Sequence, residues 1–326
     1  MALTRLLSVR LLAGVIVAAT ALAVLPAAAA ANPGHFRGVI TASTPSGRAY
    51  KAKIHPARKR RGGANNLAYH GGPVMHSDGN YTIYWVPSGY SLPTGYTGTV
   101  SAFFSNVAAA SGSTTNDYGV VRQYYDGSGY SAYEATVTGS GTDTTAYPAS
   151  GCRTSSGPCI TDAQLQTEVN NYVTAHGLPR GLGNAYFVYF PAGVTTCFDS
   201  AGSQCSGTTY CAYHSSFGSG STSTLYANMP YAGVPGCESG EYPNGSAAAD
   251  SVINVTSHEN IESITDPLGT AWYDSSGNEI GDKCAWNFGS ALGGSRGAEY
   301  NEAIASGHYY LQQDWSNANS GCVQRY

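Results

Sequence analysis

Apolar side chains recur along this chain at two spacings, one typical of strands and one typical of helices. Residues 80–87 (NYTIYWVP) alternate and are rich in β-branched and aromatic side chains, which predicts a strand. Residues 97–112 place apolar side chains three and four positions apart and stop at a glycine, which predicts a helix. Further strands are predicted at residues 118–126, 131–139, 184–191, 208–217 and 223–231.

Two more helices follow from capping and stop signals. Residues 161–177 begin with Thr161 and Gln164, the two positions of a capping box, and end at a glycine. A third helix begins near Asp250 and ends before Pro267, because the residue preceding a proline avoids the helical conformation. This order of strands and crossover helices favours an α+β fold with a mixed, twisted sheet, which is also the layout of zincin catalytic domains.

The N-terminal segment differs from the rest in composition. Two arginines precede an apolar stretch at residues 11–25, and small residues follow at 27–31, so residues 1–31 are predicted to be a secretory signal peptide. An uncleaved membrane anchor is the alternative, although the apolar stretch is short for a span. Residues 32–62 are basic and poor in large apolar side chains, which predicts a disordered leader or a propeptide-like arm.

Charge separates this arm from the remaining chain. Ten of the sixteen Lys and Arg lie at or before Arg61, whereas all twenty Asp and Glu lie after it. Residues 63–326, predicted to form a single extracellular α+β domain, therefore carry six basic and twenty acidic residues, a formal charge of −14. An acidic body argues against a nucleic-acid partner, since phosphate binding needs a basic surface. We expect a secreted monomer with no membrane span once the signal peptide is removed.

Eight cysteines, an even number, lie at positions 152, 159, 197, 205, 211, 237, 284 and 322. In an exported chain this count predicts four disulfides that staple loops. No pair has the Cys-x-x-Cys spacing that favours a structural zinc site. We expect sequential pairing: 152–159, 197–205, 211–237 and 284–322.

The segment SHENIESITDP (257–267) is similar to a zinc-peptidase helix, with Glu262 in place of the second histidine. His258 and Glu262 are four residues apart and therefore lie on one face of a helix, where both can bind one cation. Glu259 is then placed to act as the general base, like the glutamate of His-Glu-x-x-His enzymes. Zinc accepts a carboxylate oxygen, although the added negative charge makes it a weaker Lewis acid.

A catalytic zinc needs a third protein ligand, and the residues after the helix offer two. Glu279 and Asp282 stand 21 and 24 positions after His258. We assign Glu279 as the ligand and Asp282 as the group that orients the imidazole, with the reverse assignment open. Seven of the twenty acidic residues fall within positions 250–282, and such carboxylates repel one another unless a cation lies among them. The alternative is a solvated acidic helix with calcium in the loop.

Other side chains give weaker signals. His214 and His70 could each line a cleft, but a structural role near a disulfide is expected for His214. His308 and Tyr310 are expected in a packed C-terminal strand rather than as transition-state donors. Asp266 is expected to end the helix or to bond nearby backbone. The one Gly-x-Ser-x-Gly match, at residues 293–297, lies outside the predicted strands and helices and so lacks the strand–helix context of a nucleophile elbow, and there is no phosphate-binding loop; serine-based hydrolysis and nucleotide binding are therefore not supported.

Three segments resemble the EXORDIUM or phosphate-induced protein family and its secreted bacterial relatives. They are YHGGPVM (69–75), YTIYWVPSGY (81–90) and TSHENIESITDPLGTAWYDSSGNEIGDKCAWNFG (256–289), and the resemblance spans roughly residues 69–325. It implies an extracellular, apoplastic or cell-surface protein, associated in plants with growth and cell expansion. It implies no particular catalytic activity.

Two functional hypotheses follow. The first is a secreted zinc endopeptidase acting on a protein or peptide substrate. In it His258, Glu262 and Glu279 hold the metal, Glu259 activates water and Asp282 orients His258. The second is a non-catalytic EXORDIUM-like module that binds cell-wall glycan or a surface partner, with the acidic cluster structural or filled by calcium.

Overall fold

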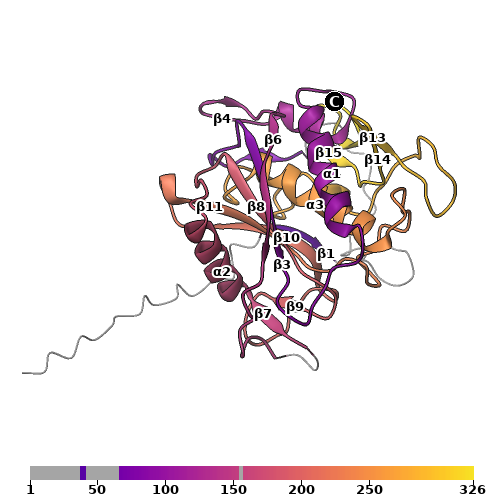
Figure 1. The fold of residues 1–326 in the computed structure, drawn as a ribbon. Coiled ribbons are helices and arrows are strands. Elements are labelled where there is room, and N and C mark those ends of the chain that lie inside the picture. Colours follow the sequence, from indigo (N-terminus) through magenta and orange to yellow (C-terminus); the bar gives the residue numbers. More distant parts are fainter. Residues whose placement is uncertain (1–36, 42–65, 154–156) are drawn as a thin grey trace, which may run out of the picture.

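A six-stranded mixed sheet forms the centre of the fold in the computed structural model, which describes residues 37–41, 66–153 and 157–326 (Figure 1). In spatial order its strands are β1 (Arg37–Thr41), β10 (Tyr210–Phe217), β11 (Thr224–Met229), β8 (Asn184–Tyr189), β3 (Asp78–Trp85) and β6 (Ala135–Asp143).

The sheet is parallel on one side and antiparallel on the other. Strands β11, β8, β3 and β6 run parallel, whereas β10 is antiparallel to both of its neighbours, β11 and β1. Parallel neighbours need crossover connections; α-helices lie in those that link β3 to β6 and β8, whereas β9 and β10 lie between β8 and β11. Helix α1 (Tyr96–Ala109) lies between β3 and β6 in the chain, and α2 (Asp162–Ala175) precedes β8. The α+β class and the mixed sheet are confirmed.

Alternation along the strands separates two cores. Ile83 and Trp85 pack on the face covered by α2, whereas Tyr84 between them packs on the face covered by α1 and α3. On β10, Ala212 lies on the α1 and α3 face and Tyr213 on the other. The next residue, His214, therefore points toward α3.

Helix α3 (Ala247–Thr265) is the motif-bearing helix and is buried on all sides. Every residue from Ala248 to Thr265 is buried, including its polar ones. The Ser246 side chain caps its N-terminus by accepting from the N–H of Ala249, and the helix ends one residue before the predicted stop at Asp266. Its start lies three residues before the predicted Asp250.

The predicted helices at 97–112 and 161–177 correspond to α1 and α2, and the capping box of α2 is present. The predicted strand at 118–126 is wrong: a 3-10 helix η1 (Asp117–Gln123) is followed by the two-residue strand β4 (Tyr125–Asp126). Tyr118, Val120 and Val121 are all buried, so consecutive apolar positions replace the alternation that marks a half-buried strand.

Short two-stranded ladders and 3-10 turns surround the main sheet. They are β2 (Ala68–Tyr69) with β12 (Trp272–Tyr273), β4 with β5 (Gly129–Tyr130), β7 (Cys159–Thr161) with β9 (Thr195–Cys197), β13 (Glu302–Ile304) with β14 (Gly307–Tyr309), β15 (Asp314–Ser316) with β16 (Gly321–Val323), η2 (Gly220–Thr222) and η3 (Asp282–Cys284). The four sequential disulfides are confirmed.

The N-terminal predictions fall largely outside the described residues. This holds for the signal peptide at 1–31 and for most of the arm at 32–62. Within the arm, residues 37–41 form strand β1 rather than disordered chain. No helix in the described part of the chain is both long and apolar enough to cross a membrane.

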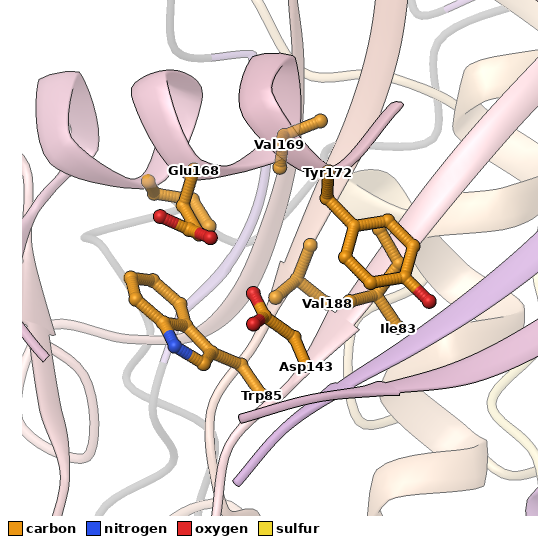
Figure 2. A pocket seen from close by; sticks show the side chains of 8 residues that line it. Ile83, Trp85, Asp143, Glu168, Val169, Tyr172 and Val188 are labelled. Atoms are coloured by element: carbon orange, nitrogen blue, oxygen red, sulfur yellow. The ribbon is translucent and has the colours of Figure 1, made fainter. Parts of the chain in front are cut away.

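On the α2 side of the sheet, two carboxylates face each other in a narrow crevice beside Trp85 (Figure 2). They belong to Asp143 of β6 and Glu168 of α2. The crevice measures about 160 Å³ in total but leaves no space for a water molecule, so it is a packing contact and not a ligand pocket. Burial and the neighbouring Asp143 carboxylate raise the pKa of Glu168 to about 7.

Replacing Glu168 with Gln should reduce the dependence of stability on pH. Because the folded-state pKa is raised, the folded protein holds more protons than the unfolded chain between the ordinary value of 4.5 and about 7. The contribution of Glu168 is therefore present at low pH and lost as pH rises through this interval. Urea unfolding from pH 4 to 8 should show a smaller fall in unfolding free energy for Glu168→Gln than for the wild type. The exposed Glu238→Gln is the control, and an unchanged slope in Glu168→Gln would refute the assignment.

Candidate metal centre

Three elements bring a cluster of ionisable side chains together in the interior. Helix α3 supplies three of them, β10 supplies one, and the segment that runs from Glu279 to the first residue of η3 supplies two. Five are the residues predicted from the sequence, and the sixth, from β10, was expected to be structural. The cluster consists of His214, His258, Glu259, Glu262, Glu279 and Asp282, of which only Asp282 has a side chain as much as 17% exposed.

Glu262 lies at the centre of this cluster. Its Oε1 accepts the backbone N–H of Gly281 at 3.1 Å and that of Asp282 at 2.9 Å, which fixes the carboxylate. Its Oε2 lies 3.1 Å from Nε2 of His258 and 3.8 Å from Nδ1 of His214. A single carboxylate oxygen therefore stands between two imidazoles.

Two overlapping groups have ligand atoms within 4.8 Å of one another. One comprises His258, Glu262 and Asp282, and the other comprises His214, Glu259 and Glu262. Each offers nitrogen and oxygen donors of the kinds that zinc accepts, and three protein ligands are the usual number at a catalytic zinc. Glu262 belongs to both groups.

Glu279 is the least compensated member of the cluster. It is fully buried, and neither carboxylate oxygen has a hydrogen-bond partner among the described residues. Its Oε1 lies 3.9 Å from Nε2 of His214. Burial, reinforced by the charges of Glu262 and Asp266, raises the pKa of Glu279 well above its usual range. A buried carboxylate of this kind is costly unless it takes up a proton or lies beside a cation.

Asp282 and the two imidazoles respond differently to burial. Burial and the Glu262 charge raise the pKa of Asp282 to about 8. Burial lowers the pKa of His214, which favours the neutral imidazole that binds metals. Burial acts in the same direction on His258, but the adjacent Glu262 carboxylate outweighs it, and the pKa of His258 is raised.

Gln312 orients His258 from the side opposite the cluster. Its side-chain nitrogen hydrogen-bonds to Nδ1 of His258 and donates to the carbonyl of Gly281 at 3.3 Å. Asp282, to which the sequence assigned this role, instead lies 3.8 Å from the other nitrogen, Nε2. With the amide in this orientation the neutral ring carries its proton on Nε2. A metal at Nε2 requires the amide to turn so that its oxygen accepts from Nδ1–H.

His214 joins the cluster through the alternation of β10. Its Nδ1 lies 3.1 Å from Oε2 of Glu259, and its Nε2 lies 3.5 Å from the carbonyl of Asp266. The sequence held a clue to this contact, because His214 is two positions after Ala212 and therefore lies on the same face of the strand. Gln312 had no such signal, because it follows His258 by 54 residues in a segment without a motif.

Of the remaining candidates, only Asp266 touches the cluster, through its carbonyl beside His214. His70 is exposed and stacks on Tyr273, and His308 is exposed and stacks on Tyr300. Asp266 accepts backbone N–H groups of the turn after α3, at 2.5 Å from Thr270 and 2.6 Å from Ala271. Tyr310 stacks on Phe288.

Two of the segments that carry the family resemblance pair with each other. Tyr69 of β2 is opposite Trp272 of β12, and the N–H of Gly72 donates to the carbonyl of Thr270 at 2.8 Å. A Cβ at Gly72 would lie 2.2 Å from Oγ1 of Thr270, so only glycine fits this approach. The pairing fixes the turn that follows α3.

These features define a disulfide-linked α+β protein with a buried carboxylate–imidazole cluster. The chain is similar to Protein EXORDIUM-like 3 of Arabidopsis thaliana, with 26% identity over 308 residues that cover 83% of this chain and 87% of that protein. No protein-family model and no solved structure matches the chain. The distant similarity supports the EXORDIUM family, and together with the disulfides it fits an extracellular protein.

Proposed function

We propose that the cluster binds a divalent cation, zinc, and that the protein is a secreted metal-dependent hydrolase. Helix α3 would supply metal ligands and the general base, as the corresponding helix does in zincins, and the substrates would be peptides. The observation that carries this proposal is Oε2 of Glu262, which is buried between two imidazole nitrogens at 3.1 and 3.8 Å. Among the described residues, no Lys or Arg forms an ion pair with Glu262, Glu279 or Asp282. Lys283 pairs instead with Asp274 at 3.1 Å.

The donor set fits zinc better than calcium. Calcium prefers oxygen ligands alone, whereas imidazole nitrogen suits zinc. Of the two groups whose donor atoms lie within 4.8 Å of one another, we assign His258, Glu262 and Asp282 as the holding group, because this choice leaves Glu259 available as the general base. Asp282 then takes the ligand role that sequence spacing gave to Glu279, and Glu279 lies beside this group.

The chain's own residues supply the remaining chemistry. A bound zinc ion acts as a Lewis acid and makes water a better nucleophile at neutral pH. Glu259 accepts the proton of the attacking water at its carboxylate. His214, whose Nδ1 lies 3.1 Å from Oε2 of Glu259, orients that carboxylate by donating its Nδ1–H, and because burial lowers the pKa of His214 the ring is neutral and can take up a proton in turn.

Protein purified without chelator should contain about one zinc per chain, measured by mass spectrometry of the metal. Glu262→Gln should lose it, because Glu262 belongs to both ligand groups. The exposed Glu238→Gln should keep it. Wild-type protein that is free of divalent metal after chelator-free purification, and that takes up none from added zinc, would refute the metal centre.

Glu259→Gln should keep its zinc and lose at least about a hundredfold of its activity on a casein-type substrate, since general-base catalysis typically contributes 10²–10⁴-fold. The paired measurement separates a base from a ligand. Loss of zinc from Glu259→Gln would place the metal in the group with His214. Full activity with zinc retained would exclude Glu259 as the base.

A surface feature favours the second candidate, glycan binding. Tyr125 and Tyr130 are 42% and 66% exposed, and their rings lie 5.7 Å apart. The Tyr125 ring also packs against Trp272 at 5.1 Å and Tyr69 at 5.6 Å. Aromatic rings held at a surface provide apolar faces on which the apolar faces of sugars can stack.

Under this second candidate, the protein should sediment with insoluble cell-wall glycan, and Tyr130→Ala should reduce the bound fraction. Tyr326→Ala removes a tyrosine of similar exposure, 50%, outside this aromatic group and is the matched control. Equal sedimentation of both variants and the wild type would exclude the aromatic group as the binding surface.

A further inference from the structure

Strand β1 comes from the basic arm and lies beside the candidate metal centre. It forms the edge of the main sheet beside β10 (Figure 1), to which it is antiparallel, and its residue Arg37 is opposite His214 in the register. It also lies against α3 and against η3, the 3-10 helix that begins at Asp282. A strand from the N-terminal arm therefore lies along the three elements that supply the cluster.

The cluster is closed while β1 is in this position. The side chains of His258, Glu259 and Glu262 have no exposed surface, and that of His214 is 4% exposed. A polymer cannot reach such a site unless a covering element moves. The five-residue strand β1 pairs with the sheet only through β10, and this β1–β10 ladder contains two register irregularities. It is the element whose release opens a strand-shaped space next to His214.

The backbone of β10 determines what can fill that space. The outer edge of β10 presents N–H and C=O groups that pair with any extended chain, as β1 shows. Charge restricts the choice further: residues 32–62 contain eight Lys or Arg and no Asp or Glu, whereas residues 63–326 carry a formal charge of −14. Opposite charge favours the encounter of a basic segment with this domain.

We propose that the outer edge of β10 is a binding site for basic peptides in extended conformation, and that β1 occupies it in the full chain. Release of the arm then admits such a peptide alongside His214 and the cluster. The binding site stands on the β1–β10 pairing alone. That the bound peptide is then hydrolysed rests on the proposed function.

The test uses the full chain with a site-specific protease sequence inserted between Gly62 and Gly63. Binding of a fluorescent peptide of residues 36–45 (FRGVITASTP) is followed by anisotropy before cleavage, and again after cleavage and washing of the arm from the domain in high salt. Where the arm stays bound, its exchange for excess labelled peptide is measured. The cleaved chain should bind saturably, with an apparent affinity about a hundredfold above that of the uncut chain, because a tethered competitor acts at millimolar effective concentration.

Two single-proline peptides separate strand pairing from charge attraction. Successive residues of a strand direct their N–H groups to opposite edges, so Val39→Pro and Ile40→Pro remove different hydrogen bonds at unchanged charge. One of the two peptides should bind much more weakly than the other. Equal binding of both proline peptides and the parent, or no binding to the cleaved chain, would overturn the proposal. If the protein binds the peptide saturably but is free of zinc and inactive, the proposed peptide site on β10 is supported and the proposed hydrolase function is refuted.

Discussion

The burial of carboxylates around α3 is the constraint on which the structure depends. A carboxylate that leaves water loses several kcal/mol of hydration unless a proton, a cation or hydrogen-bond donors replace it. Helix α3 runs through the interior and is buried on every side, yet it carries His258, Glu259 and Glu262 in its second half. An apolar helix would fill this space at no such cost. The elements packed around α3 are therefore arranged to meet its polar side chains.

Much of that arrangement consists of paired polar groups from distant parts of the chain. Asn260 donates to both oxygens of Asp78 on β3, at 3.2 and 3.1 Å, and accepts from the Tyr118 hydroxyl at 3.0 Å. The amide oxygen of Asn254 accepts the N–H of Gln312 at 2.9 Å. Such contacts set the rotation of α3 about its axis. Because that rotation is fixed, residues four apart on the helix face β10 and the η3 loop.

Local signals predicted local structure. The capping box at Thr161 and the short cysteine spacings specify their own surroundings, since the interacting groups are close in sequence. The position of η1 and the roles of His214 and Gln312 depend on what packs against them. His214 becomes part of the cluster only because β10 lies beside α3, and Gln312 reaches His258 from a segment 54 residues away. Helical spacing placed His258 and Glu262 together, but it did not predict that the cluster would be closed.

A second set of buried carboxylates meets the same loss of hydration without a neighbouring imidazole. Burial and the charge of Asp117 raise the pKa of Glu302 to about 10, and burial raises the pKa of Asp314 well above its usual range. Both are buried, no histidine contributes to either shift, and Arg325 only partly offsets that of Glu302, so burial favours the protonated, neutral form of both groups. The surroundings of Glu262 act in the opposite direction. Two imidazole nitrogens approach one of its oxygens, and the pKa of this carboxylate is lowered despite its burial. A carboxylate that stays ionised in the interior, beside nitrogen donors and next to the uncompensated Glu279, is the feature on which the proposed cation site rests.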